Sequence, residues 1–271
     1  VDFSRKLLRG EKPDLLLEAD ATDPSAVGFA QAAVSGLVTT VLNRDLIGPL
    51  AKLQASAPPF NVVSHQHYNP ESISQYNIVP GLMGVMLTMT MIMITGLAIT
   101  RERERGTMEN LLSTPVHPGE VIVGKIVPYI MVGYVQVILV LLAAKFLFDV
   151  PMLGSVPLLF LLVLLFIVAN LAVGITFSTI AKNQLQAVQM AFFFFLPSLL
   201  LSGYMFPFRG MPVWAQDIGE CLPLTHFLRV VRGILLKGNG IAETLPDLWP
   251  IALFLTIVLI VGIKRYRQTL D

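Results

Sequence analysis

Histidine and cysteine side chains are the first candidates for chemistry in this sequence. His65 and His67 could supply half of a metal site, and Cys221 with His226 could form a thiol–imidazole pair for nucleophilic catalysis. Neither pair has its remaining partners visible in the sequence. The chain also lacks the Gly-x-x-x-x-Gly-Lys-Ser/Thr loop that cradles phosphates in many nucleotide-binding proteins. We therefore expect no catalytic residue, no cofactor and no metal site on this chain, and no enzymatic activity of its own.

Apolar stretches dominate the elements that must position any functional residue. Hydrophobic residues make up 54% of the chain and charged residues 14%, which excludes an ordinary soluble globule. A spanning helix needs about 20 apolar residues to cross about 30 Å of hydrocarbon. The stretches that meet this requirement are Ile78–Thr100, Ile126–Phe148, Val156–Ile180, Ala187–Phe206 and Leu248–Ile263. The sequence therefore predicts an all-α polytopic membrane protein with five visible transmembrane helices.

The predicted spans contain almost no ionisable side chains. Ion-driven transporters and intramembrane proteases need such groups at membrane depth, and no histidine or aspartate lies in any of these stretches. Lys145 lies near a helix end, where its ammonium can reach the headgroups. If the protein moves a substrate, we expect the energy to come from another molecule. The net charge of +1 also argues against nucleic-acid partners.

Positive charge assigns the two sides of the membrane. Cytoplasmic loops carry an excess of lysine and arginine, and one set of alternating loops holds Arg101, Arg103, Arg105, Lys125, Lys182, Lys264, Arg265 and Arg267. This set predicts a cytoplasmic tail, with residues 1–77 and the loop at 207–246 outside. That outside loop carries a counter-signal of Arg209, Arg229, Arg232 and Lys237.

The first 77 residues are interpreted as part of a small α+β domain on the extracytoplasmic side. Asp14–Ala19 and Asn61–His65 are strand candidates. Ala26–Leu42 is a helix candidate with Asp23 as its N-cap, and its polar residues favour a packed soluble helix over a span. The sequence shows no initiator methionine and no signal sequence, so an outside domain needs an export route. We expect one further membrane helix ahead of the first residue, and six in the full-length chain.

The loop after the first predicted span has more structure than a solvated loop needs. Met108, Leu111 and Leu112 fall at i, i+3 and i+4, which predicts a short helix with an apolar stripe. Pro115 ends that helix, and Pro118 can begin the next one. Such a helix can lie on the membrane surface or fill a groove in another protein. A charged interfacial loop is the plainer alternative.

The same loop resembles the segment that follows the second membrane helix in ABC-2 type permeases. The family pattern Glu-Arg-Glu-x-Gly-Thr-x-Glu-x-Leu-Leu-x-Thr-Pro falls on Glu102 to Pro115. Weaker matches are Tyr68-Asn69-Pro70-Glu71 with Val79-Pro80-Gly81, and Pro223-Leu224-Thr225-His226-Phe227 followed by Arg232-Gly233. Together these matches cover most of the chain in the order that the family has.

The resemblance implies a six-helix subunit that pairs with a second permease copy or a close paralogue. A separate ABC ATP-binding subunit, which holds ATP and Mg²⁺, would drive it. A large outside domain between the first two helices is typical of the drug-export branch, so residues 1–77 resemble part of that domain and residues 78–271 the ABC-2 transmembrane domain.

Two sets of residues carry over from the family. The cytoplasmic loop at 101–120 docks on the ATPase in the family, which makes these the expected coupling residues: Glu102, Arg103, Glu104, Gly106, Thr107, Glu109, Leu111, Leu112 and Pro115. The outside loop at 207–246 resembles re-entrant helices that cap the exit path, with Pro223, Thr225, His226, Arg232 and Gly233 as its matched residues. The alternative for this loop is an amphipathic segment lying at the membrane interface.

We therefore expect the permease subunit of an ATP-driven ABC exporter in the bacterial inner membrane. Its substrate would be hydrophobic or amphipathic, such as a drug-like molecule, a lipid or a glycolipid. Phe192–Phe195 could line a path for it or face lipid. A periplasmic adaptor is a further candidate partner. The alternative from a different class is a non-transporting scaffold or assembly protein whose outside domain binds an envelope partner.

Overall fold

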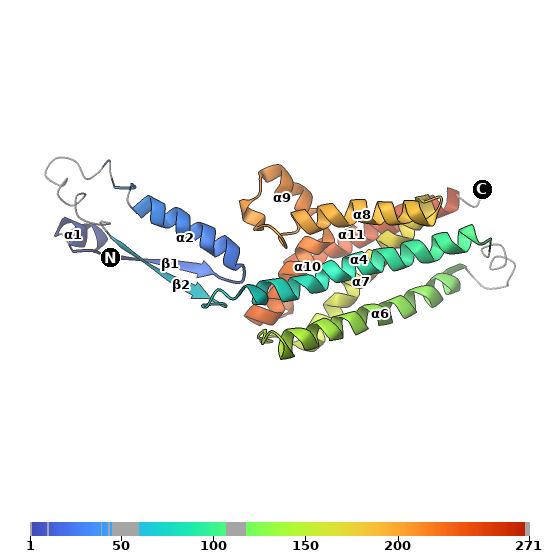
Figure 1. The fold of residues 1–271 in the computed structure, drawn as a ribbon, viewed down its shortest axis with the longest axis horizontal. Coiled ribbons are helices and arrows are strands. Elements are labelled where there is room, and N and C mark those ends of the chain that lie inside the picture. Colours follow the sequence, from blue (N-terminus) through green and yellow to red (C-terminus); the bar gives the residue numbers. More distant parts are fainter. Residues whose placement is uncertain are drawn as a thin grey trace. The chain divides into compact units, whose positions relative to one another are not determined.

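The structure is a computed structural model that describes residues 2–9, 11–38, 40–42, 44, 60–106 and 118–268. Of these, residues 103, 118–123, 125 and 265–268 are described by their backbone alone. The chain divides into two compact units, Val1–Ser74 and Gln75–Asp271. The described strands lie in the first unit, and the second is helical (Figure 1).

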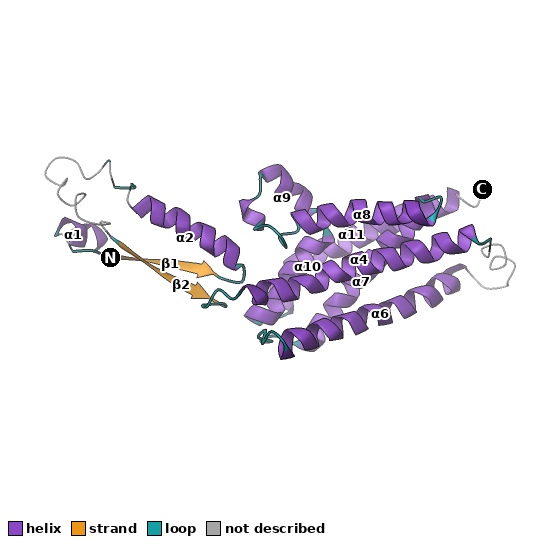
Figure 2. Cartoon of the chain, in the orientation of Figure 1, coloured by secondary structure: helices purple, strands orange, loops and turns teal. Residues whose placement is uncertain are grey.

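The first unit is a β–α–β arrangement preceded by the short helix α1 (Phe3–Leu8). β1 (Asp14–Asp20) and β2 (Asn61–His67) pair in parallel, from Asp14↔Asn61 to Asp20↔His67 (Figure 2). Parallel neighbours need a crossover connection, and α2 (Pro24–Val38) belongs to it. Both predicted strands are confirmed, and each runs one or two residues further than expected.

The start of α2 follows from its capping residue. The Asp23 carboxylate accepts hydrogen bonds from the backbone N–H groups of Ser25, at 3.1 Å, and Ala26, at 3.4 Å. These are donors that the first turn of a helix leaves without an internal partner. The helix ends at Val38 rather than at the predicted Leu42, and residues 40–42 form a turn.

The second unit contains five described helices that are long and apolar enough to cross a membrane. They are α4 (Ser74–Glu104), α6 (Pro118–Phe146), α7 (Val156–Ile180), α8 (Gln184–Leu201) and α11 (Ile241–Gln268). The prediction of five spans is confirmed, and α7 has the predicted bounds. Ser155 caps α7, because its hydroxyl oxygen accepts a hydrogen bond from the Leu158 N–H.

The other four predicted spans have different bounds. α4 extends beyond both ends of the predicted Ile78–Thr100, and α6 begins at Pro118 rather than at Ile126 and ends at Phe146 rather than at Phe148. α8 begins at Gln184 because Asn183 caps it, and it ends at Leu201, before the left-handed Gly203, rather than at Phe206. α11 begins at Ile241 rather than at Leu248. α11 includes Pro246 and Pro250, which lie just before and just after the predicted start at Leu248. Membrane helices tolerate such prolines where neighbouring groups satisfy the freed backbone.

Short helical segments fill the region between α8 and α11. They are η2 (Phe208–Gly210), α9 (Val213–Glu220), α10 (Pro223–Arg232) and the π-helical turn η3 (Gly233–Lys237). α10 begins at the predicted Pro223, in the first helical position that suits proline. Most of its residues are buried, as are those of η3. α10 is therefore a packed element of this unit and does not lie on its surface.

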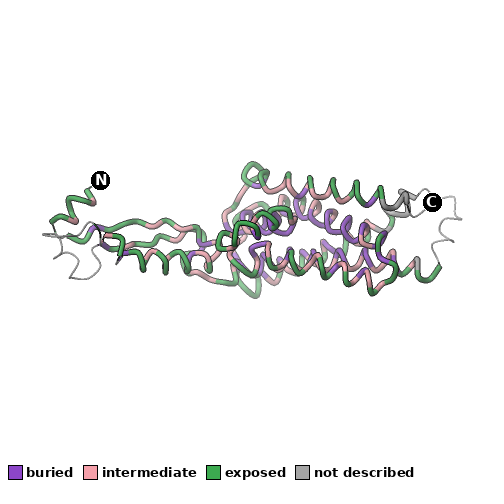
Figure 3. Tube along the Cα trace, turned by 90° about the horizontal axis from the view of Figure 1, so that it is seen from above, coloured by how far each residue is buried: buried purple, intermediate pink, exposed green. Residues whose placement is uncertain are grey.

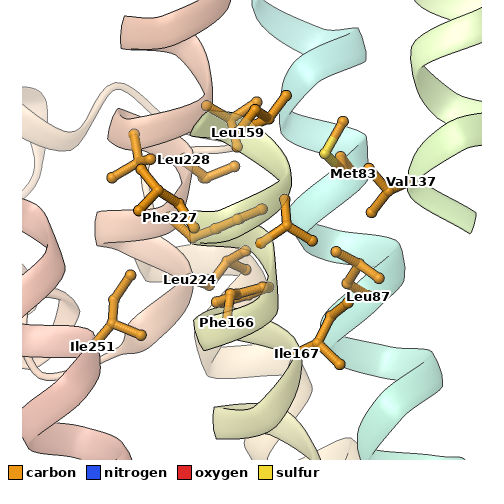
Figure 4. Close-up of a cluster of buried hydrophobic side chains, with 14 of the residues drawn as sticks. Met83, Leu87, Val137, Leu159, Phe166, Ile167, Leu224, Phe227, Leu228 and Ile251 are labelled. Carbon is orange, nitrogen blue, oxygen red and sulfur yellow. The ribbon is translucent and has the colours of Figure 1, made fainter. Parts of the chain in front are cut away.

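The core of the second unit lies around α7 and α10. The rings of Phe166 and Phe227 stack at 3.9 Å between centroids, and both side chains are fully buried. Side chains from α4, α6, α7, α10 and α11 converge on this cluster (Figure 4). Buried residues are concentrated inside the helical unit, whereas most described residues of the first unit are exposed or partly exposed (Figure 3).

Candidate functional site: the two ends of the helical unit

Hydrogen bonds between helices show which helix ends lie together. The Glu104 carboxylate, in the last turn of α4, accepts hydrogen bonds from the backbone N–H of Gln184, at 2.8 Å, and from its side-chain amide. Near the end of α7, the Thr176 hydroxyl donates to the Val258 carbonyl of α11 at 3.4 Å. The last turns of α4, α7 and α11 therefore share one end of the unit with the first turn of α8. We call it the basic end, after the exposed cations Arg101, Arg105, Lys182 and Lys264.

The predicted coupling segment begins at the basic end. Of the expected coupling residues, the structure describes Glu102 and Glu104 in α4 and Gly106 just beyond it, and it describes Arg103 by its backbone alone. Gly106 has a φ of +69°, the left-handed conformation that commonly ends helices. The other expected residues lie outside the described part of the chain: Thr107, Glu109, Leu111, Leu112 and Pro115.

Glu104 has an electrostatic role that its sequence position does not reveal. The side-chain and backbone hydrogen bonds from Gln184 lower the pKa of the Glu104 carboxyl, so it stays ionised at neutral pH. The ionised carboxylate also lies before the first turn of α8, where the helix dipole favours negative charge. The contact joins the helix that leads into the predicted coupling loop to a second membrane helix.

The opposite end of the unit is covered by α9, α10 and η3, and we call it the capped end. The Arg232 guanidinium donates to the Asn77 side-chain oxygen, in the first turns of α4, at 2.7 Å, and to the Gly203 carbonyl after α8 at 3.3 Å. The N–H of Leu153, ahead of α7, donates to the Leu235 carbonyl of η3 at 3.0 Å. The capping segments are thus tied to the ends of several spans.

A polar cluster of Glu220, His226, Arg229 and Asp247 joins α9, α10 and α11 at the capped end. His226 is 5% exposed, and its Nδ1 lies 3.0 Å from an Asp247 carboxylate oxygen, while its Nε2 lies 2.9 Å from the Glu220 carbonyl. Arg229 binds the Glu220 carboxylate at 2.5 and 3.1 Å and approaches Asp247 at 3.5 Å. Its guanidinium also lies over the Phe208 ring, 4.8 Å from the centroid.

The cluster favours protonated His226. Burial lowers the pKa of the imidazole, but its hydrogen bonds to Asp247 and to the Glu220 carbonyl, together with the two carboxylate charges, raise it by more. Both partners are acceptors, and the two ring nitrogens can donate to both of them only in the imidazolium form. The carboxylates of Glu220 and Asp247 therefore neutralise the His226 imidazolium and the Arg229 guanidinium within the protein.

The capped end holds all the residues predicted for the exit-side loop, but in separate places. The Thr225 hydroxyl donates to the Gly219 carbonyl at 2.6 Å, and His226 belongs to the polar cluster. Arg232 contacts Asn77 instead. Gly233 begins η3, where an added Cβ would lie 2.7 Å from the Asn239 amide nitrogen. Pro223 begins α10.

The thiol–imidazole pair considered from the sequence does not form. Cys221 is exposed, and its Sγ lies 3.5 Å from the Asp217 carbonyl, while both ring nitrogens of His226 have other partners. Sequence reasoning also missed Glu220, Arg229, Asp247 and Asn77 as members of the capped end. Asn77 and Asp247 have partners in distant parts of the sequence, and Glu220 and Arg229 meet across the break between α9 and α10, so no spacing pattern marks them.

Comparisons with known proteins place the chain among transporters. The family described as ABC-2 family transporter protein matches residues 1–264. The probable multidrug ABC transporter permease YbhS of Escherichia coli K12 is 32% identical over 243 residues, covering 88% of this chain and 63% of YbhS. The probable multidrug ABC transporter permease YbhR of the same organism is 30% identical over 253 residues, covering 93% of this chain and 67% of YbhR.

A third relative extends the match over nearly the whole chain. The inner membrane transport permease YhhJ of Escherichia coli K12 is 31% identical over 283 residues, covering 99% of this chain and 71% of YhhJ. No solved structure matches. The chain spans between 63% and 71% of the length of these relatives. With its candidate spans and the family match over residues 1–264, this multi-pass membrane chain belongs to the ABC-2 family of transporter proteins, as a permease domain.

Proposed function

We propose that the chain is the membrane-spanning subunit of an ATP-driven exporter in a bacterial inner membrane. A separate ATPase subunit would bind ATP and Mg²⁺, and the substrate would be hydrophobic or amphipathic. The observation that carries this proposal is the family match over residues 1–264, because relatives that align over most of this chain are described as multidrug permeases.

The distribution of charge supports a cytoplasmic basic end. Its cations are exposed, as expected for loops that obey the positive-inside tendency. Two of the arginines that contradicted this tendency in the sequence are bonded within the capped end: Arg229 to two carboxylates and Arg232 to Asn77 and Gly203. Arg209 is exposed. On this topology, residues 1–77 lead into α4 from the extracytoplasmic side.

The contact between α4 and α8 supports a coupling role for the loop at 101–120. Glu104 lies near the start of this segment, in the last turn of α4, and accepts two hydrogen bonds from Gln184. An ATPase that displaces the loop would therefore move α4 and α8 together. The expected coupling residues beyond Gly106, including Glu109 and Leu111, would form the docking surface.

The packing of the capped end supports its role as the covering of an exit path. α10 and η3 bridge the starts of α4, α7 and α11, so a path that opens outward must displace them or pass beside them. The second permease copy and the adaptor follow from the family resemblance. An apolar substrate fits the exposed aromatic face of α8, where Phe193 is 79% exposed.

Co-purification from mild detergent tests the proposed function. We expect an ABC ATP-binding subunit at near one-to-one stoichiometry with the full-length protein, detected by mass spectrometry. The double variant Glu109→Arg, Leu111→Asp should lose the ATPase while it remains folded, since it reverses a charge and breaks the apolar stripe. Arg209→Glu is the matched control, because it reverses an exposed charge between α8 and α9.

Transport in inside-out vesicles separates the exporter from a scaffold. We expect ATP-dependent accumulation of an amphipathic fluorescent dye with the wild type and the Arg209→Glu control, and no accumulation with the double variant. An ATPase that never co-purifies, together with dye movement that ignores ATP, would favour the non-transporting scaffold instead.

A further inference from the structure

Three potential metal ligands meet on the exposed face of the strand pair in the first unit. In a strand, residues i and i+2 point to the same face, so His65 and His67 project together from β2. Glu18 of β1 pairs in register with His65. The ligand atoms of these three exposed side chains all lie within 4.8 Å of one another.

Within the described residues, α2 packs on the opposite face of the strand pair and not on this one. The Gln31 amide of α2 donates to the Ser64 hydroxyl of β2 at 2.8 Å. Leu17 and Val62 line, with α2, a cavity of about 430 Å³ on that opposite side. Because Glu18, His65 and His67 alternate with these inward residues, their side chains point away from α2 and do not pack against it.

The donor set fits a borderline transition-metal ion. Two imidazoles and one carboxylate suit Zn²⁺ or Cu²⁺, whereas Mg²⁺ and Ca²⁺ prefer oxygen ligands alone. The His65 and His67 ring centroids lie 4.5 Å apart at 76°, so the rings are not stacked flat on each other. Bonds of about 2.1 Å to a tetrahedral ion would bring the donor atoms to about 3.4 Å from one another, which side-chain rotation can achieve.

We propose that Glu18, His65 and His67 bind one divalent transition-metal ion on the first unit, with water completing its coordination. Asp20 pairs in register with His67, and its carboxylate, which accepts hydrogen bonds from Thr22, adds negative charge beside the site. The bound ion links β1 to β2 and so stabilises the folded unit, because an unfolded chain does not hold these residues together. The site does not depend on the proposed transport function.

The proposed site departs from the sequence expectation of no metal site. The sequence showed the His-x-His half, but the third ligand lies on another strand, and only the parallel register brings it beside the histidines. No spacing rule for metal motifs covers such a pair of strands.

Metal titration of the full-length protein tests the site. The protein is purified in detergent with a non-histidine affinity tag, stripped with a chelator, and titrated with Zn²⁺ in a calorimeter and with Cu²⁺ in an electron paramagnetic resonance spectrometer. We expect one ion per chain and a Cu²⁺ spectrum with hyperfine structure from two nitrogens. His65→Asn, His67→Asn together should abolish this spectrum.

Matched variants of β1 separate ligation from general charge effects. Glu18→Gln should weaken Zn²⁺ binding by about tenfold or more. Asp14→Asn is the control, since it removes the same charge from the same face of β1 about 13 Å away along the strand, and should leave the affinity unchanged. At the same concentration, Zn²⁺ should also raise the melting temperature of the wild type by more than that of Glu18→Gln.

Two results would overturn the proposal. One is Zn²⁺ binding of equal affinity and stoichiometry in the wild type and the double histidine variant. The other is a Cu²⁺ spectrum without nitrogen hyperfine structure in a protein whose metal-free melting temperature is normal.

Discussion

The two ends of the helical unit hold their charges in different ways. At the basic end, the side chains of Arg101, Arg105, Lys182 and Lys264 are exposed. At the capped end, Arg229 and His226 are bonded to carboxylates, and Arg232 to an amide and a carbonyl. A cation that is bonded within the protein carries less information about membrane side than one exposed to solvent. The difference accounts for the part of the mixed positive-inside signal that Arg229 and Arg232 contribute, whereas Arg209 in the same loop is exposed.

The largest effect is expected from the packing of the capped end. Phe227→Ala removes a fully buried ring stacked on Phe166 and should lower the free energy of unfolding by about 3–5 kcal/mol. The measurement is denaturant titration in detergent, followed by the fluorescence of Trp214 and Trp249. Phe193→Ala, an exposed ring on α8, is the control and should change little. If Phe227→Ala and Phe193→Ala lowered the free energy of unfolding equally, α10 would not be part of the core.

A smaller loss is expected from the Arg232 contacts. Arg232→Met keeps the apolar stem but leaves the Asn77 amide oxygen and the Gly203 carbonyl without this donor, at a cost of about 1–3 kcal/mol. Arg101→Met at the basic end should change stability by no more than about 0.5 kcal/mol. The same denaturant titration measures the free energy of unfolding of both variants. If Arg101→Met lowers it as much as Arg232→Met, the proposed difference between the two ends is wrong.

The smallest stability effect is the pH dependence of the polar cluster. Because the pKa of His226 is raised in the fold, its contribution is fully present below about pH 6.5, the ordinary histidine value, and is lost as pH rises through the higher folded pKa. Stability should therefore fall with rising pH, by at most about 1.4 kcal/mol per pH unit for one proton.

His226→Gln isolates that contribution. The variant should show a flatter dependence on pH than the wild type, in melting curves recorded from about pH 6 to about pH 9. Asp247→Asn should flatten it in part, since one of the carboxylates that favours the imidazolium is gone while Glu220 remains. A wild-type stability that rises with pH relative to His226→Gln has the wrong sign for this cluster.

Local sequence signals predicted most of the elements. The apolar run of Val156–Ile180 has a capping serine directly before it and contains no charged residue, so its bounds were clear. The strand candidates Asp14–Ala19 and Asn61–His65 and the cap at Asp23 located β1, β2 and α2 in the first unit. Each of these signals lies within a few residues of the element that it predicts.

Contacts between distant residues could not be predicted in this way. The start of α11 was misplaced because Pro246 and the acidic residues Glu243 and Asp247 resemble a loop when their partners are unknown. Asp247 has a helical position that places it beside His226, and Arg232 reaches Asn77 across the unit. Such pairs depend on how the helices pack, which no single segment encodes.

The central claim is that the basic end faces the cytoplasm and the capped end faces the outside. Cys221, the one cysteine in the sequence, is exposed at the capped end and serves as a native probe. In cells with a permeabilised outer membrane, a membrane-impermeant maleimide should label the wild type. It should label the variant Cys221→Ser, Lys182→Cys only after the inner membrane is broken. The reverse pattern, with Lys182→Cys labelled in intact cells and Cys221 protected, would contradict the account.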